Sequence, residues 1–193
     1  MSDATGDGDC SLITGERREL SIAKVGKQRY RVQLPAMDYL NLLAPHRHGE
    51  VAMVIQRTAG WVLLQTKATY PPGTFRIPTG TIRKGESAEK TMLRELMEEA
   101  SLTPGRHRKL CRLEYAVEGG RKGFHTVVYL IEEPRGELMP MDLTEAITAW
   151  REAPIADLPS VARELRRLEP PRDGWGLYRS AVHQVVADLL LPV

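Results

Sequence analysis

The sequence predicts a single α/β domain in which strands stand on both sides of one central helix and further helices follow the last strand. Two observations predict this class. Apolar runs of strand length flank residues 87–100, which carry a helical pattern, and two more helical stretches lie near the C-terminus. With 193 residues, 42% of them hydrophobic and 27% charged, the chain suits one soluble globular domain with its own core.

The chain is expected to open with a tail and a strand pair. Residues 1–16 are small, polar and rich in Gly and Asp, which predicts a flexible tail. Residues 17–45 are expected to form an N-terminal strand extension of a single domain that spans residues 17–193. Within this extension, Leu20–Leu34 alternates loosely between apolar and polar residues around Gly26, as in a hairpin.

The remaining elements follow in order along the chain. Val51–Ile55 and Trp61–Gln65 are apolar runs separated by a turn, so we expect neighbouring buried strands. A short extended piece is then expected at Phe75–Pro78, followed by the central helix at Ser87–Ala100. Three strands are expected at Lys109–Val117, Thr126–Glu132 and Ala146–Trp150. Two C-terminal helices are expected at Ile155–Leu168 and Gly176–Leu191.

The central helix is predicted to carry three carboxylates on one face. At about 100° per residue, Glu95, Glu98 and Glu99 fall within about a quarter turn of each other. The opposite face is predicted to pack on the core through Met92, Leu93, Leu96, Met97 and Ala100. Carboxylates three and four residues apart repel, and a divalent cation relieves that repulsion. Oxygen ligands with no His or Cys nearby favour Mg²⁺, with Mn²⁺ as the alternative.

The loop before this helix strengthens the functional interpretation. An isolated Glu-Glu pair is usually a solvated helix surface. Here Gly80 and Gly85 bracket a tight loop that delivers Glu86 to the helix N-terminus, with Ser87 placed to cap the helix. A strand, a glycine-bracketed loop and an acidic helix together indicate a cradle for phosphate and metal.

The segment from Gly80 to Leu102 resembles the Nudix box, G-x5-E-x7-R-E-U-x-E-E-x-G-U, in which U is a bulky aliphatic residue. The matching positions are Gly80, Glu86, Arg94, Glu95, Leu96, Glu98, Glu99 and Leu102. Ser101 stands where the pattern has its last glycine, which is a left-handed helix cap. The resemblance implies the Nudix fold, an α/β/α sandwich with a mixed β-sheet, here with an N-terminal strand extension and C-terminal helices.

The same resemblance implies Mg²⁺-dependent hydrolysis of a phosphoanhydride bond. Its metal ligands would be Glu95, Glu98 and Glu99, helped by Glu86 and by the backbone carbonyl of Thr79. Arg94 would be structural. The general base would be either one of these box glutamates or Glu145, on the loop before the last strand.

Three residues outside the acidic trio are candidates for substrate binding. Arg76 lies on the strand that enters the box and reaches substrate phosphate if its side chain faces the cleft. Arg83 lies in the box loop. Tyr70 precedes Pro71-Pro72 and is a candidate to line a nucleotide site, although a packed loop aromatic is the commoner role.

The implied substrate is a nucleoside diphosphate linked to another moiety. The stretch Ile77–Ile82 and the N-terminal strands resemble ADP-ribose or nucleotide-sugar pyrophosphatases, which favours that type. The basic-glutamine-aromatic motif of that group is absent from Leu64–Tyr70. RNA 5′-pyrophosphohydrolases and dinucleoside polyphosphate hydrolases have a similar box and stay as alternatives. A non-catalytic Nudix sensor that binds nucleotide is a third interpretation, and it would be expected to have lost box carboxylates.

Composition bounds the partners and the compartment. A net charge of +2 gives no support for membrane binding or general nucleic-acid binding, so an RNA 5′ end is the only nucleic-acid partner considered. Cys10 and Cys111 have no metal-ligand or redox spacing. No run approaches the ~18 apolar residues of a membrane span and no signal peptide is recognisable, which predicts a cytoplasmic protein. Similarity to the ADP-ribose type implies a homodimer through strand exchange by Leu20–Leu34.

Overall fold

The computed structural model describes residues 19–35, 49–117, 124–140, 144 and 146–191. Its main sheet has six strands and is mixed, because the β2–β6 and β3–β7 pairs are parallel and the other pairs antiparallel. In spatial order the strands are β1 (Ser21–Gly26), β2 (Arg29–Leu34), β6 (Arg106–Val117), β7 (His125–Glu132), β3 (Glu50–Gln56) and β5 (Thr79–Thr81).

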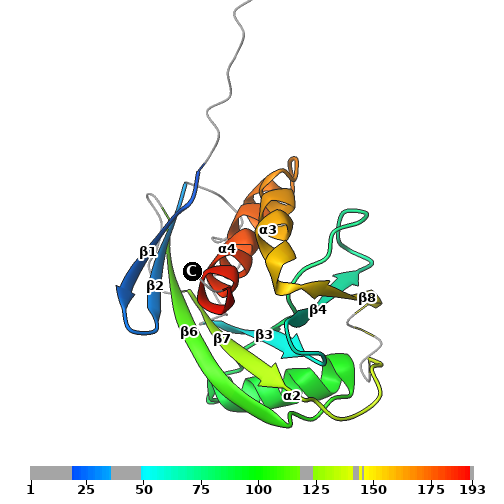
Figure 1. Cartoon of the computed structure of the whole chain (residues 1–193). Coiled ribbons are helices and arrows are strands. Elements are labelled where there is room, and N and C mark those ends of the chain that lie inside the picture. The colour runs from blue at the N-terminus through cyan, green and yellow to red at the C-terminus, as the bar shows by residue number, and fades with distance from the viewer. Residues whose placement is uncertain (1–18, 36–48, 118–123, 141–143, 145, 192–193) are drawn as a thin grey trace, which may run out of the picture.

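Helices cover both faces of this sheet, as Figure 1 shows. Helix α2 (Ala88–Ala100) packs on one face, whereas α3 (Leu158–Arg166) and α4 (Asp173–Leu190) pack on the other. A separate two-stranded sheet pairs β4 (Trp61–Lys67) with β8 (Ile147–Pro154), and a short 3₁₀ helix, η2 (Ile155–Asp157), follows it. The expected α/β/α sandwich with a mixed sheet is confirmed.

The central strands divide their side chains between two cores. On β3, Val51, Met53 and Ile55 pack with α2, whereas Ala52 and Val54 pack with α3 and α4. Successive side chains of a strand point to opposite faces, so a strand with helices on both faces is apolar at every position. This double burial explains the continuous apolar run from Val51 to Ile55.

Two strands that were predicted to be neighbours lie in different sheets. Val51–Ile55 and Trp61–Gln65 are both buried strands, but β3 and β4 do not pair with each other. The β3 strand lies between β7 and β5, and β4 pairs in antiparallel register with β8. Periodicity reports that a strand is buried, but it carries no information about which strand is its partner.

The N-terminal hairpin forms as expected. The β2 strand alternates strictly, with Tyr30, Val32 and Leu34 buried, and β1 is an exposed edge strand. The predicted tail at residues 1–16 and the end of the extension at residues 36–45 lie outside the described residues. Among described helices, none is long and apolar enough to cross a membrane.

Helix α2 begins and ends at capping residues. The Ser87 side chain accepts a hydrogen bond from the Lys90 backbone N–H at 3.2 Å, which confirms the predicted N-cap, a feature worth about 1 kcal/mol. Ser101 adopts the left-handed conformation with φ 56° and donates its hydroxyl to the Met139 carbonyl at 2.6 Å. Serine therefore forms the cap for which the family pattern has glycine. Leu93, predicted to face the core, is 39% exposed, because the buried stripe runs through Met92, Leu96 and Ala100.

The elements after α2 agree with the predicted strands and helices, with ends that differ by a few residues. The β6 strand begins three residues earlier than predicted, at Arg106, and β8 continues to Pro154. The predicted Ile155–Leu168 helix is the η2 turn followed by α3, and α4 begins at Asp173 instead of Gly176.

Helix α4 is fixed to the segment that leads into β5 by one buried histidine. His183 Nε2 accepts the Ile77 backbone N–H at 3.0 Å, and its Nδ1 lies 3.0 Å from the Arg179 carbonyl. These partners require a neutral ring with the proton on Nδ1. Burial lowers the pKa of His183 to about 3, and the charges of Arg76 and Arg179 act in the same direction.

The first prediction concerns this histidine. Its folded-state pKa lies below its ordinary value, so below about pH 6.5 the unfolded chain binds a proton that the folded chain does not. Stability should therefore fall as the pH drops, by up to ~1.4 kcal/mol per pH unit from this group. We expect His183→Gln to lower the free energy of unfolding at pH 7 by about 1–3 kcal/mol but to give a shallower pH dependence between pH 6 and 4.

The measurement is denaturant unfolding across this pH range. His107→Gln is the matched control, because His107 lies at the surface and contacts Glu89. Parallel pH curves for wild type and His183→Gln would contradict the buried neutral histidine.

Candidate active site

The acidic face of α2 borders a cavity of about 280 Å³. Glu95 and Glu99 are 6% and 1% exposed, so this face is not the solvated surface that an isolated Glu-Glu pair usually forms. The cavity is lined by residues from β3, β4, β5, α2, α4 and the connecting loops: Glu50, Lys67, Arg76, Thr79, Gly80, Thr81, Arg83, Glu95, Glu99 and Arg179.

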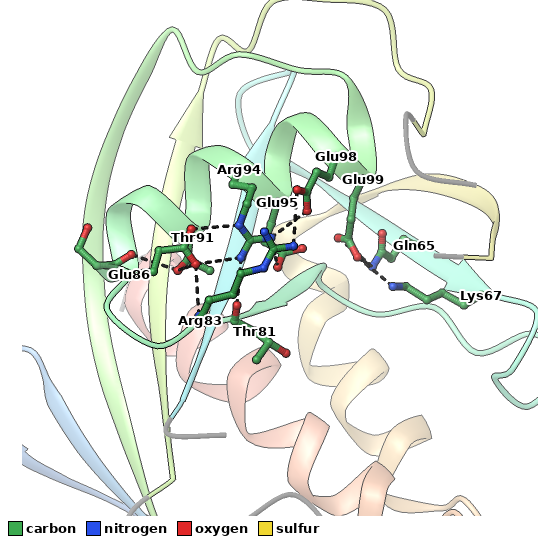
Figure 2. A network of polar contacts seen from close by, with 11 residues as sticks. Gln65, Lys67, Thr81, Arg83, Glu86, Thr91, Arg94, Glu95, Glu98 and Glu99 are labelled. Carbon is green, nitrogen blue, oxygen red and sulfur yellow. Dashed lines mark hydrogen bonds and ion pairs between the residues drawn. The ribbon is translucent and has the colours of Figure 1, made fainter. Parts of the chain in front are cut away.

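Arg94 is the centre of the acidic cluster (Figure 2). Its Nη1 donates to Glu95 and to Glu98, each at 2.8 Å, and its Nε and Nη2 donate to the two oxygens of Glu86 at 3.0 Å. Nη2 also donates to the Thr81 backbone carbonyl at 3.1 Å, which joins α2 to β5. The guanidinium thus orients three carboxylates at once and has the structural place that the resemblance implied.

Glu86 is held by the box loop as well as by Arg94. The Arg83 backbone N–H donates to Glu86 at 3.2 Å, and the Thr91 hydroxyl donates to the same oxygen at 2.9 Å. The turn that makes this contact contains Gly85 at φ 81°, a conformation that favours glycine. The hydrogen bond from Arg94 is the main reason why the pKa of Glu86 is lowered to about 2, so this carboxylate is ionised at neutral pH.

Glu99 lies at the other end of the acidic face and has different partners. Lys67 Nζ donates to Glu99 at 2.9 Å, and Gln65 Nε2 lies 3.3 Å from the second oxygen. Figure 2 shows these two β4 side chains reaching Glu99 from the side away from Arg94. Lys67 is 12% exposed and its partner 1%, so the pair is buried within the cavity wall.

Glu95 lies between these two groups and is packed against Gly80. Burial raises the pKa of Glu95 to about 7, and the neighbouring charges of Glu99 and Glu98 add to this shift, while Arg94 opposes it. A β-carbon on Gly80 would lie 1.9 Å from Glu95 Cγ. The box glycine is therefore required because the glutamate side chain passes directly over its backbone.

The donor set fits a hard divalent cation. The box provides carboxylate oxygens from four glutamates and no nitrogen or sulfur ligand, which is the chemistry of Mg²⁺ and Mn²⁺ sites. In the described part of the chain, no three acidic, His or Cys side chains converge on one point. The carboxylates instead point toward Arg94 and Lys67, which balance their charge.

Cationic side chains form another part of the wall. Arg76 is 4% exposed and donates through Nη1 to the Ile77 carbonyl at 2.8 Å and to the Thr79 hydroxyl at 3.0 Å. Its Nη2 donates to the Tyr70 hydroxyl, and its guanidinium carbon lies 5.0 Å from the Tyr70 ring centroid. Tyr70 also packs on Trp175, so it lies behind Arg76 and supports it instead of lining the cavity.

The predicted site residues are thus largely gathered in one place. Glu86, Glu95, Glu98 and Glu99 share one helix face and loop, while Arg76, Arg83 and Thr79 line the cavity beside them. Arg83 is exposed and its Nη2 lies 3.7 Å from Glu98. Glu145, the alternative base, lies outside the described residues.

Sequence reasoning missed four polar residues of the site: Glu50, Lys67 and Arg179, which line the cavity, and Gln65, which contacts Glu99. A signal existed for two of them. Glu50 opens an otherwise apolar run, and Arg179 stands in a helix that is apolar on most of its surface. Charged residues in such settings are buried only when they are paired.

Together, an acidic helix that follows a glycine-bracketed loop and a cationic wall form a candidate site for metal and phosphate on an α/β/α sandwich. A family model described as the NUDIX domain matches residues 46–173. The match covers more than half of the chain, and the chain belongs to the Nudix family. The prediction of a Nudix pyrophosphohydrolase is confirmed at the level of its family.

Individual relatives agree with this assignment. The putative mutator protein MutT4 of Mycobacterium tuberculosis is 41% identical over 88 residues, which are 45% of this chain and 35% of that protein. The chain therefore spans about a third of the length of this curated relative.

Solved structures similar to this chain include two Nudix proteins. The MutT Nudix hydrolase of Burkholderia pseudomallei has a TM-score of 0.54 at 18% identity, with 76% of this chain and 99% of that chain covered. The Nudix domain of Shewanella oneidensis NrtR, solved in complex with ADP ribose, has a TM-score of 0.47 at 21% identity, with 77% and 99% covered. The likeness to the Burkholderia protein shows the shared fold.

The packing of Glu95 over Gly80 generates the second prediction. We expect Gly80→Ala to displace the Glu95 side chain, to abolish most hydrolytic activity and to weaken Mn²⁺ binding, at a cost of about 1–3 kcal/mol in stability. Activity, Mn²⁺ titration by electron paramagnetic resonance and thermal unfolding measure these effects. Gly26→Ala is the control, because a β-carbon there would lie at an ordinary 3.7 Å from Arg29. Normal metal binding by a folded Gly80→Ala protein would contradict the role given to this contact.

Proposed function

We propose that this protein hydrolyses a phosphoanhydride bond in a nucleoside diphosphate linked to another moiety, with a divalent metal ion, Mg²⁺ first and Mn²⁺ as the alternative. One observation supports this most directly. The cavity of about 280 Å³ has both the carboxylates of Glu95 and Glu99 and the cations Lys67, Arg76 and Arg179 in its wall. A diphosphate with a bound divalent ion needs both kinds of partner.

In this proposal Glu95, Glu98 and Glu99 hold the metal, helped by Glu86 and the Thr79 carbonyl. When held there, the ion would screen the diphosphate oxygens and lower the pKa of the attacking water. Arg94 holds its carboxylate partners in place through the four oxygens to which its guanidinium donates.

A glutamate removes the proton of the attacking water. Glu98 is the box candidate that the geometry favours, because its side chain is 35% exposed whereas Glu95 and Glu99 are almost fully buried. Access to water is a condition for a base that activates it. Glu145 remains the alternative base.

On the substrate side, Arg76 and Arg83 bind phosphate oxygens. Arg76 is prepared for this role, because Tyr70 and Thr79 hold its guanidinium at the wall before substrate arrives. Such preorganisation reduces the entropy lost on binding. Arg83 is exposed and lies near Glu98, at the open side of the site.

ADP-ribose or a nucleotide sugar is the favoured substrate class, on the sequence resemblance of the strand that enters the box. An RNA 5′ end and a dinucleoside polyphosphate are the alternatives. A sensor that binds nucleotide without cleaving it is disfavoured, because the acidic positions of the box are all present.

The third prediction tests the reaction and its substrate. We expect the protein to release phosphate or a nucleoside monophosphate from one class within a panel of ADP-ribose, nucleotide sugars, dinucleoside polyphosphates, nucleoside triphosphates and 5′-triphosphorylated RNA. Cleavage should require Mg²⁺ and stop with EDTA. Tight nucleotide binding without turnover across the panel would support the sensor instead.

A pair of variants on one helix gives this assay its internal control. Glu98→Gln removes a proposed ligand and should lower turnover by about 100-fold or more, since even partners of metal ligands are worth about 10- to 100-fold. Glu89→Gln is the matched control, since this exposed glutamate contacts His107 and does not line the cavity. Equal turnover in the two variants would remove Glu98 from the proposed site.

We also propose a homodimer, as the fourth prediction. The β1 strand is an exposed edge, and Val25 on it is 45% exposed, so the N-terminal hairpin offers a surface for a second copy. Light scattering across a concentration series should give twice the subunit mass of 21.7 kDa. A single-subunit mass at every concentration would refute the dimer. The cytoplasmic location stays a prediction.

A further inference from the structure

Helix α4 brings one arginine into the catalytic cavity from outside the matched family domain. The family match ends at residue 173, where α4 begins, and Arg179 lies in the second turn of this helix. Most of its neighbours on the helix are buried and apolar. Arg179 is charged but is also buried, at 8% exposure, and it lines the cavity beside Arg76 and Glu99. A buried charge in such a helix needs a partner.

Glu50 is that partner. Arg179 Nη1 donates to both carboxylate oxygens of Glu50, at 2.7 and 2.9 Å. Tyr178 and Thr126 donate their hydroxyls to Glu50 Oε1 at 2.7 and 3.1 Å. With donors from β7 and α4 around it, the carboxylate is fixed, and the guanidinium bound to it is fixed as well.

This pair is joined to the box by consecutive contacts. Glu50 on β3 is the register partner of Thr81 on β5, and the Thr81 carbonyl accepts a hydrogen bond from Arg94. His183, one turn beyond Arg179, binds the backbone of Ile77 next to Arg76. Arg179 therefore has a set position relative to both the acidic face and the arginine that enters the box.

Charge balance indicates what Arg179 is suited to bind. The cavity wall carries Lys67, Arg76, Arg83 and Arg179 against Glu50, Glu95 and Glu99. The acidic face would take up divalent cations in the proposed reaction, and each ion adds two positive charges. The cationic wall then has more positive charge than its own carboxylates balance, which favours a ligand with several anionic oxygens.

We propose that Arg179 is a substrate-binding residue that donates to a non-bridging oxygen of a substrate phosphate, and that Glu50 positions its guanidinium for this contact. The inference rests on the proposed function and identifies the phosphate group as the part of the substrate that α4 recognises. A buried Arg–Glu pair is weak support for stability alone, because well-packed apolar residues often replace it without loss. Its place in the wall of the cavity gives it a second role.

The fifth prediction separates this role from a structural one. Arg179→Gln alone leaves Glu50 buried without its cation and is expected to lower stability. In the double variant Glu50→Gln/Arg179→Gln both charges are removed, so thermal unfolding should return toward wild type. If Arg179 binds substrate phosphate, the KM of the double variant should still be about 10- to 100-fold higher than that of the wild type. This is the change expected when one charge-assisted hydrogen bond to the substrate is lost. The corresponding change in kcat should be less than about threefold.

Binding measured without turnover completes the test. Calorimetric titration with ADP and Mg²⁺ should give a Kd raised by the same ~10- to 100-fold in the double variant. Arg179→Lys, which keeps the charge but not the planar fork, should recover part of the affinity. Arg163→Gln on α3 is the control, since Arg163 is exposed and contacts Ser160.

Each outcome decides one statement. A folded double variant with wild-type KM and ADP affinity would make Arg179 a structural counter-ion of Glu50 and overturn the inference. If the double variant does not fold, the Arg179→Lys protein decides, and unchanged ADP affinity there overturns the inference as well. A wild type that binds ADP through Arg179 but cleaves nothing in the substrate panel would instead overturn the proposed hydrolysis and leave the binding role in place.

Discussion

The fork of Arg94 is the interaction on which the rest of the site depends. One guanidinium reaches Glu86 at the start of the box, Glu95 and Glu98 on α2, and the Thr81 carbonyl on β5. Arginine is suited to this position because its donors are fixed in a plane and it stays charged. A lysine at position 94 would supply the charge but not the simultaneous contacts to a loop, a helix and a strand.

This arrangement offsets the electrostatic cost of gathering carboxylates where water is scarce. The hydrogen bond from Arg94 lowers the pKa of Glu86 to about 2, whereas burial raises the pKa of Glu95 to about 7. Glu99 is balanced separately, by Lys67 from β4. The acidic face is thus divided between two cations that come from different parts of the chain. A divalent ion bound at this face would compete with these cations for the same oxygens.

Whether a feature of the fold could be predicted from the sequence depended on how far apart in the chain its interacting residues stand. The faces of α2 follow from a period of 3.6 residues, and the cap at Ser87 is a local contact, so both were predicted correctly. Leu93 shows the limit of such periodicity, because it lies on the apolar side of the helix and is still 39% exposed. The helical period does not say how far the sheet that packs against the helix extends. The pairing of β4 with β8 joins segments about 90 residues apart, and periodicity says nothing about such partners.

The same limit applied to the site. Glu86, Glu95, Glu98 and Glu99 were found because they stand in one continuous motif, and Arg76 because it adjoins that motif. Lys67 and the Glu50–Arg179 pair were missed because their partners are distant in sequence, and in the pair the two residues are 129 positions apart. The available signal was indirect: a charged residue in an apolar element requires a buried counter-charge, whose identity only the fold reveals.

The C-terminal helix therefore belongs to the site, although the family match ends where it begins. If α4 only covered the sheet, an apolar helix would be sufficient, and its surface would need no arginine or histidine. Instead, His183 binds the backbone of Ile77 and Arg179 binds Glu50, so α4 contacts both the segment that leads into β5 and the strand β3. These contacts require α4 to keep one rotation and one position along its axis, because a turn of even one residue would carry both side chains away from their partners. A helix that lies beyond the matched domain can in this way change which phosphate compound is bound while leaving the acidic helix α2 as it is.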